Sequence, residues 1–277
     1  EGDRWELFFS RDGFLSQYRV DGRELLAEGA ALRPQFWRAP TENDLGAGLD
    51  ARFGVWKSPV LKLTQFDAVT EEGVAVVTAR YEMPQVKGVL TMTYRINGAG
   101  EVSVAEQLEA GDAEAPGMFR FGMTMAMPAR YSEIVYYGRG AHENYCDRLS
   151  SADLGLYSQK VADQYHDEYV RPQESGTKSD LRWWSVVDSS GSGLVILSEA
   201  PFSASALPYA TEALDVTNFP PQQHSGPLRS GDRTYVNFDL RQMGLGCINS
   251  WGELPEDQYM IPYGDYTFRF LLRPTVK

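Results

Sequence analysis

The sequence of 277 residues has only two cysteines and three histidines. Cys146 and Cys247 lie far apart without a CxxC or Cys/His spacing, which argues against a disulfide framework and a zinc site. The histidines His142, His166 and His224 form no HExxH motif, and no GxSxG lies near them, so no motif supports metal-assisted or serine-type hydrolysis. No stretch approaches the roughly 18 apolar residues that a membrane-spanning helix requires.

Basic residues are also few, since 26 Lys and Arg stand against 38 Asp and Glu for a formal charge of -12. A polyanion would meet net repulsion, so neither nucleic acid nor an anionic membrane surface is an expected partner. The first residues show no basic or apolar segment of a targeting signal. The chain starts without Met, which favours a fragment of a longer polypeptide. The parent protein could be cytoplasmic or exported. The sequence does not indicate its oligomeric state.

Helical periodicity is scarce. The pattern from Thr211 to Leu214 predicts one short helical turn. The segment from Ser151 to Val161 is a weak helical candidate. A (β/α)₈ barrel would fit the length, but it needs eight amphipathic helices that the sequence does not show. We therefore reject that fold.

The sequence instead alternates apolar and polar residues. From Met118 to Met127 the odd positions are apolar, which predicts a strand with one buried face. Turn dipeptides, such as Asp12-Gly13, Asp21-Gly22 and Asn97-Gly98, separate such runs. The predicted strands are 5–10, 14–20, 74–83, 89–96, 102–109, 118–127, 133–137, 181–187, 194–198, 236–240 and 266–273. These features predict an all-β fold, a single domain over residues 1–277 with two large packed antiparallel sheets. Long connections are expected near 38–58, 138–180 and 215–231.

Aromatic residues are the most informative candidates for binding. Sugar sites combine an aromatic face, which covers the C–H patch of a pyranose, with nearby polar side chains. Trp251 lies in a glycine-punctuated segment where it need not face a core, although core packing is the commoner fate of a tryptophan. The segment 41–48 carries two glycines and fits either a mobile lid or a plain surface loop. With 38 acidic residues, the pair of carboxylates that a glycosidase needs can be neither selected nor excluded.

Four segments together resemble the C-terminal region, also called the small chain or domain 5, of the family 2 glycoside hydrolase β-galactosidases. They occur in the order of that family and cover essentially the whole chain. They are Arg33 to Asp44 (RxxFxRAPxDND in the family), Tyr137 to Arg148 (GxGPxENYxDR), Tyr169 to Gly176 (YxxPQExG) and Gln242 to Trp251 (QMGxGxxxSW).

The resemblance implies a galactose-mutarotase-like supersandwich of two antiparallel sheets. It also implies a retaining β-galactosidase that hydrolyses terminal β-D-galactosides such as lactose. In that family the catalytic glutamates belong to a separate upstream barrel, so this chain would hold no catalytic residue and would be inactive alone. Its partners would be the galactoside substrate and the upstream domains of the same polypeptide.

By the same resemblance, Trp251 is the aromatic platform for substrate. Gly46 belongs to a loop that shifts as the sugar moves deeper into the site, and Asn43 and Asp44 form the polar start of that loop without an assigned chemical role. The chain departs from several relatives at Ala141-His142 and in the residues after Gly46. Whole enzymes of this kind use Mg²⁺ or Ca²⁺ and Na⁺, but no cofactor or metal is expected in this chain.

Two other functions fit parts of the pattern. A stand-alone aldose 1-epimerase would share the sandwich and would need His142 or His166 as its acid, with a Glu base. A non-catalytic carbohydrate-binding module would use Trp251 and other exposed aromatic residues without any barrel.

Overall fold

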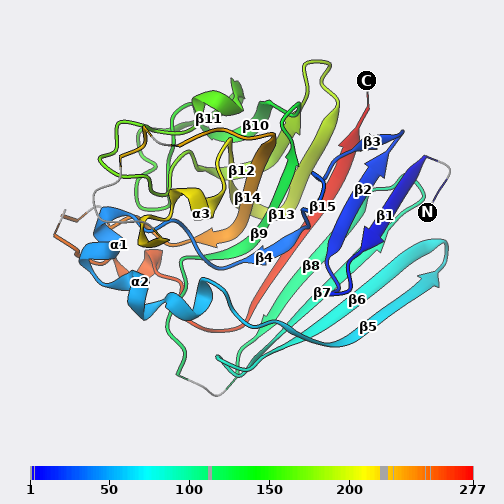
Figure 1. The fold of residues 1–277 in the computed structure, drawn as a ribbon, viewed down its shortest axis with the longest axis horizontal. Helices are drawn as coiled ribbons and strands as arrows, with labels where there is room; N and C mark the ends of the chain where they lie inside the picture. The colour runs from blue at the N-terminus through cyan, green and yellow to red at the C-terminus, as the bar shows by residue number, and fades with distance from the viewer. Residues whose placement is uncertain are drawn as a thin grey trace.

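The computed structural model describes residues 2, 4–111, 114–218, 224–226, 228–246, 248–249 and 251–276, and antiparallel strands dominate it (Figure 1). The strands are β1 (Trp5–Phe9), β2 (Leu15–Val20), β3 (Arg23–Glu24), β4 (Arg33–Gln35), β5 (Lys62–Glu71), β6 (Val74–Met83), β7 (Gly88–Ile96), β8 (Val102–Glu109), β9 (Arg120–Pro128), β10 (Glu133–Gly140), β11 (Asp153–Lys160), β12 (Lys178–Val187), β13 (Gly193–Leu207), β14 (Arg233–Gln242) and β15 (Tyr266–Thr275). The helices are α1 (Glu42–Gly46), α2 (Leu49–Arg52) and α3 (Thr211–Leu214), with 3₁₀ turns η1 (Gly54–Trp56), η2 (Val161–Asp163), η3 (Val216–Asn218) and η4 (Asp257–Tyr259).

The sheets are a 3-stranded sheet of β1 to β3 and a 12-stranded sheet that divides at β13. Residues 193–198 of β13 pair with β15, whereas residues 203–207 pair with β14, which continues to β9 and β4. The two branches pack face to face, because Phe238 on β14 meets Phe270 on β15 with ring centroids 5.0 Å apart. This layered antiparallel arrangement confirms the predicted all-β fold class.

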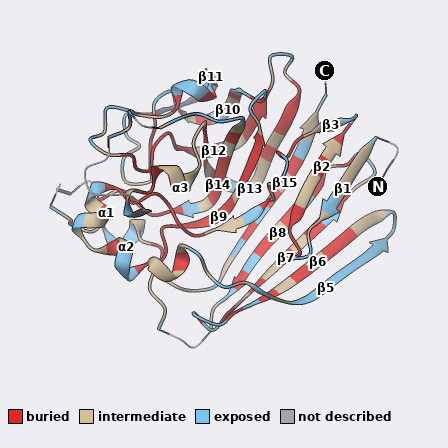
Figure 2. Ribbon diagram, in the orientation of Figure 1, coloured by how far each residue is buried: buried red, intermediate tan, exposed pale blue. Residues whose placement is uncertain are grey.

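The main cluster of buried residues comes from strands of both branches, where Figure 2 colours many positions as buried. The odd positions of β9 are buried as the alternation predicts, but Arg120 and Gly122 on its other face are buried too. The expectation of one buried face is therefore wrong for β9. On this second face, Glu174 from the segment before β12 places its carboxylate 3.0 Å from Arg120 Nη2.

The helical expectation for Ser151 to Val161 is wrong, because these residues form the edge strand β11, which pairs with β10. Strand β5 at the other edge was not predicted, since most of its residues are exposed and its alternation is weak. The turn at 211–214 is confirmed as α3. The long connection at 215–231 falls partly outside the described residues, as do Cys247 and Ser250.

Tight turns follow the predicted glycines in two of three cases. Gly13 and Gly22 have φ of 82° and 73°, whereas in the turn from β7 to β8 the positive φ of 78° falls on Gly100 rather than on Gly98. The connection at 38–58 folds into α1, α2 and η1, and α1 and α2 lie at the end of the molecule away from β1 to β3 (Figure 1).

Candidate functional site

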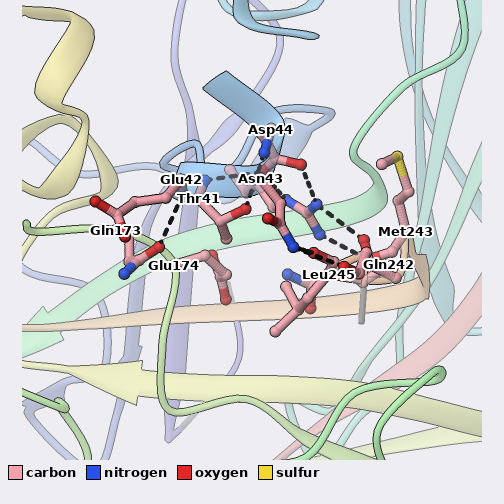
Figure 3. A network of polar contacts seen from close by, with 12 residues as sticks. Thr41, Glu42, Asn43, Asp44, Gln173, Glu174, Gln242, Met243 and Leu245 are labelled. Carbon is pink, nitrogen blue, oxygen red and sulfur yellow. Dashed lines mark hydrogen bonds and ion pairs between the residues drawn. The ribbon is translucent and has the colours of Figure 1, made fainter. Parts of the chain in front are cut away.

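Three of the motif segments, 33–44, 169–176 and 242–251, meet at the end of the molecule that carries α1 (Figure 3). The fourth, 137–148, joins them because Asp147 Oδ2 accepts from the N–H of Gly246 at 3.0 Å. Arg38 is fully buried and donates to both carboxylate oxygens of Asp44, from Nε to Oδ2 at 3.0 Å and from Nη2 to Oδ1 at 2.7 Å. Its guanidinium also donates to the carbonyls of Met243 at 2.6 Å and Gly244 at 2.9 Å. Burial alone would lower the pKa of Arg38, but Asp44, together with Glu174 and Tyr145, outweighs it and raises that pKa. This buried pair ties the first motif to the last one.

The segment 41–48, which fits either a lid or a surface loop by sequence, begins as a capped helical turn. The Oγ1 of Thr41 accepts from the backbone N–H of Asp44 at 3.2 Å, and Asp44 Oδ2 accepts from the N–H of Thr41 at 2.8 Å. This reciprocal capping box satisfies two backbone donors that a helix N-terminus otherwise leaves open. Asn43 then donates its amide to the carbonyls of Leu245 at 3.2 Å and Gly246 at 2.6 Å. Asn43 and Asp44 therefore position the Trp251 segment.

Two glycines bring α1 against the chain beside Trp251. A β-carbon on Gly252 would lie 2.5 Å from the carbonyl carbon of Gly46, and one on Gly46 would lie 3.1 Å from Cα of Gly252. Gly252 also has a φ of 86°, which favours glycine. The backbone N–H of Trp251 donates to Asn249 Oδ1 at 2.8 Å, and the residue is 88% exposed. The structure thus places the predicted residues Gly46 and Trp251 side by side, with the indole outside the core.

The segment around Gln173 and Glu174 supports α1 from the other side. Gln173 Oε1 accepts from the N–H of Glu42 at 3.2 Å (Figure 3). The buried carboxylate of Glu174 accepts from Arg120 Nη2 at 3.0 Å and from Thr177 Oγ1 at 2.9 Å. Charge-assisted hydrogen bonds of this kind fix geometry more strongly than neutral ones.

Glu143 organises a neighbouring hollow of about 290 Å³. Its carboxylate accepts from Tyr169 Oη at 2.5 Å, from the N–H of Gly176 at 2.8 Å and from Arg148. Burial would raise the pKa of Glu143, but these hydrogen bonds and nearby His166 outweigh it and lower that pKa. His142 and His166, the two acids considered for an epimerase, line the same hollow.

Sequence reasoning does not single out the buried carboxyls of Glu106 and Asp239. Glu106 on β8 is fully buried, and neither of its carboxylate oxygens has a hydrogen-bond partner within the described chain. Burial raises its pKa well above the usual range, and the charge of Asp239 adds to that effect. Burial likewise raises the pKa of Asp239 to about 7. The signal for Glu106 was available, since it occupies an inward position of the alternation Val102, Val104, Glu106, Leu108.

The described residues bring together no group of three or more His, Cys, Asp or Glu side chains suited to a metal ion. Within the same residues, we find no helix of the length and apolar character needed to cross a membrane.

A model of the family described as the β-galactosidase small chain matches residues 1–272. A β-galactosidase of Priestia megaterium is 32% identical over 272 residues, which are 97% of this chain and 25% of that protein. A β-galactosidase of Lactobacillus delbrueckii subsp. bulgaricus is 30% identical over 265 residues, 94% of this chain and 25% of that protein. The chain thus spans about a quarter of the length of these relatives.

Solved structures agree on the fold alone. A galactose mutarotase related enzyme from Lactobacillus acidophilus aligns with a TM-score of 0.52 at 7% identity, covering 100% of this chain and 96% of that one. A galactose 1-epimerase from the same species aligns with a TM-score of 0.50 at 10% identity, covering 99% of this chain and 92% of that one.

Proposed function

The chain belongs to the β-galactosidase small-chain family, and from this premise we propose that it is the C-terminal domain of a retaining, family 2 β-galactosidase. In this proposal residues 1–277 form one domain that completes the substrate site of a catalytic barrel carried by upstream domains. The whole enzyme hydrolyses terminal β-D-galactosides such as lactose.

The observation that carries this proposal is the exposed indole of Trp251 on a fixed support. A large aromatic side chain is usually buried. The side chain of Trp251 is 88% exposed beside a tight backbone contact, so it is available to bind another surface. The C–H face of a pyranose is such a surface. Asn43 and the Gly46–Gly252 contact would hold the platform in place before substrate binds.

Three buried carboxylates of the site are suited to holding it together rather than to catalysis. A retaining glycosidase needs a nucleophile and an acid/base about 5 Å apart and open to the sugar. Here Asp44, Glu143 and Glu174 are buried and accept hydrogen bonds from arginine side chains. The chain would therefore contribute binding energy and site closure while upstream glutamates perform the double displacement.

The ions expected for the whole enzyme, Mg²⁺ or Ca²⁺ and Na⁺, enter no step that we assign to this chain. Whether this chain holds any of them stays a matter for the whole enzyme, and we assign them no ligand here.

An epimerase activity is less well supported, although His142, Glu143 and His166 line one hollow. A general base works best with a pKa near the operating pH, whereas the hydrogen bonds to Glu143 lower its pKa. A carbohydrate-binding module would bind galactose or lactose strongly by itself, whereas half of a shared site would bind weakly.

The proposal is tested by assaying the chain alone and the full-length enzyme with an aryl β-galactoside. We expect hydrolysis by the full-length enzyme only. Polarimetry of α-galactose with the chain alone should show no accelerated mutarotation. Hydrolysis or mutarotation by the isolated chain would contradict the proposal.

A further inference from the structure

Strand β11 forms one edge of the 12-stranded sheet, and β5 forms the other (Figure 1). Within the described residues β11 pairs only with β10, and the register runs through all 8 residues of β11 without a bulge. Directly after β11, the backbone N–H of Val161 donates to the carbonyl of Ser132, on the β10 side. Because the bonding direction alternates along an antiparallel strand, the backbone groups of residues 154, 156, 158 and 160 point to the open edge.

Proteins usually protect such an edge. A bulge, a proline or a charge in the middle of the strand hinders a second strand from pairing with it. Strand β5 has two of these devices, a register shift between Leu63 and Gln65 and the charge of Asp67 near its middle. Strand β11 has no bulge and no proline, and its charged residues, Asp153 and Lys160, stand at its two ends. The middle of β11 is therefore open to pairing.

The side chains beside this open edge are apolar. Leu154 and Leu156 of β11 are 47% and 68% exposed. Leu156 lies opposite Tyr137 of β10, which is also exposed, and Tyr137 lies opposite Trp183 of β12. Residues directly opposite each other on antiparallel strands share one face of the sheet, so these side chains form an apolar row that begins at the edge. Contiguous exposed apolar side chains mark interaction surfaces.

Strand β11 is also held in shape before any partner arrives. The ring of Tyr157 stacks on that of Tyr136 in β10, with centroids 5.3 Å apart. The hydroxyl of Tyr157 donates to the carbonyl of Asp153 at 2.9 Å. A strand that is already ordered loses little entropy when it pairs, which favours affinity.

The order of charges along β11 suits a second copy of the same strand. In an antiparallel pair of two copies, the Asp153 end of each strand lies beside the Lys160 end of the other, and opposite charges across strands stabilise such a pair. A twofold axis at Leu156 places the two Leu156 side chains opposite each other, and Leu154 opposite Ser158 of the second copy. The contact is closed, because the same surface serves both copies.

We propose that β11 is the edge through which two copies of this chain pair their sheets about a twofold axis. This inference goes beyond the proposed function and does not depend on it. It assigns an interaction surface to a part of the fold that carries none of the predicted site residues.

The first test is cross-linking of the full-length enzyme that contains Leu156→Cys. Directly opposite residues of paired strands have Cβ atoms about 4.5–5.5 Å apart, so a short bis-maleimide should join two copies at this position. The expected product is a covalent species of twice the chain mass. Val69→Cys is the matched control, because Val69 is an exposed apolar residue of the other edge strand, β5. This control and the unchanged enzyme should not give that species.

The second test is analytical ultracentrifugation of the full-length enzyme that contains Leu156→Lys. Like charges directly opposite each other destabilise a strand pair, so the sedimenting mass should fall to about half. Val69→Lys should leave the mass unchanged. Leu156 is largely exposed, so these substitutions remove no core contact.

Two results would overturn the inference. One is the absence of cross-linked pairs in Leu156→Cys, which is the result expected if a further domain of the same polypeptide covers β11. The other is an equal sedimenting mass for Leu156→Lys and the unchanged enzyme. Neither result bears on the role of Trp251, which the KM of Trp251→Ala tests separately.

Discussion

Gly46 and Gly252 contact each other through their backbones: a β-carbon on Gly252 would overlap the backbone of Gly46, and one on Gly46 would lie 3.1 Å from Cα of Gly252. Gly252 follows Trp251 directly, so this contact sets where the exposed indole stands. A side chain at Gly252 would push the segment around Trp251 away from α1.

Gly252→Ala should therefore destabilise the chain and misplace the platform. The methyl group would lie 2.5 Å from a backbone carbon, and the φ of 86° adds strain. We expect a loss of about 1–3 kcal/mol in the free energy of unfolding. Gly73→Ala is the matched control, because Gly73 has a φ of 81° but no atom near its β-position. Equal losses measured by urea unfolding would contradict the packing argument.

The buried pair of Arg38 and Asp44 should be costly to break. Arg38→Met leaves the Asp44 carboxylate buried without its partner, which costs about 3–5 kcal/mol. Adding Asp44→Asn should recover part of that loss, because the uncompensated charge disappears. Arg4→Met is the comparison. The pair of Arg4 with Asp21 is exposed, so its loss should lower the free energy of unfolding far less. If Arg38→Met and Arg4→Met gave similar unfolding curves, the anchoring role of Arg38 would be wrong.

Asp239 should make stability fall as pH rises. In the unfolded chain an aspartate has a pKa of about 4, whereas burial raises the folded pKa of Asp239 to about 7. Between these values the folded state keeps a proton that the unfolded state releases, so the free energy of unfolding decreases with rising pH. Glu106 acts in the same direction.

Asp239→Asn should flatten this dependence, as measured by urea unfolding at pH 5 and pH 7.5. Asp232→Asn, at a side chain that is 97% exposed, is the control and should leave the slope as it is. The same pH slope in Asp239→Asn and in the unchanged chain would exclude Asp239 as its source.

The sequence predicted the elements whose alternation reflects a single buried face. Strands such as β7 and β8 alternate regularly because they lie inside the sheet with one face on the core. The edge strands β5 and β11 are mostly exposed, so few of their positions require an apolar residue and the pattern weakens. A helix was therefore expected where β11 forms.

The motifs named candidate site residues but did not predict the contacts between them. The motifs marked Asn43, Asp44, Gly46 and Trp251, and the structure brings their segments together. The contact of Gly46 with Gly252 depends on how the connections at 38–58 and 243–252 fold over the sheet, which periodicity does not describe. The bond of Arg38 to Asp44 is equally hidden, because its buried environment comes from Met243 and Gly244, far along the chain.

The most direct test of the platform is the KM of Trp251→Ala and Trp251→Phe in the full-length enzyme. If stacking on the indole resembles base–aromatic stacking, its loss costs about 1–3 kcal/mol, so Trp251→Ala should raise KM by roughly fivefold to 150-fold. Trp251→Phe keeps an aromatic face and should lie between that variant and the unchanged enzyme. A KM in Trp251→Ala equal to that of the unchanged enzyme would contradict the role of Trp251 in substrate binding.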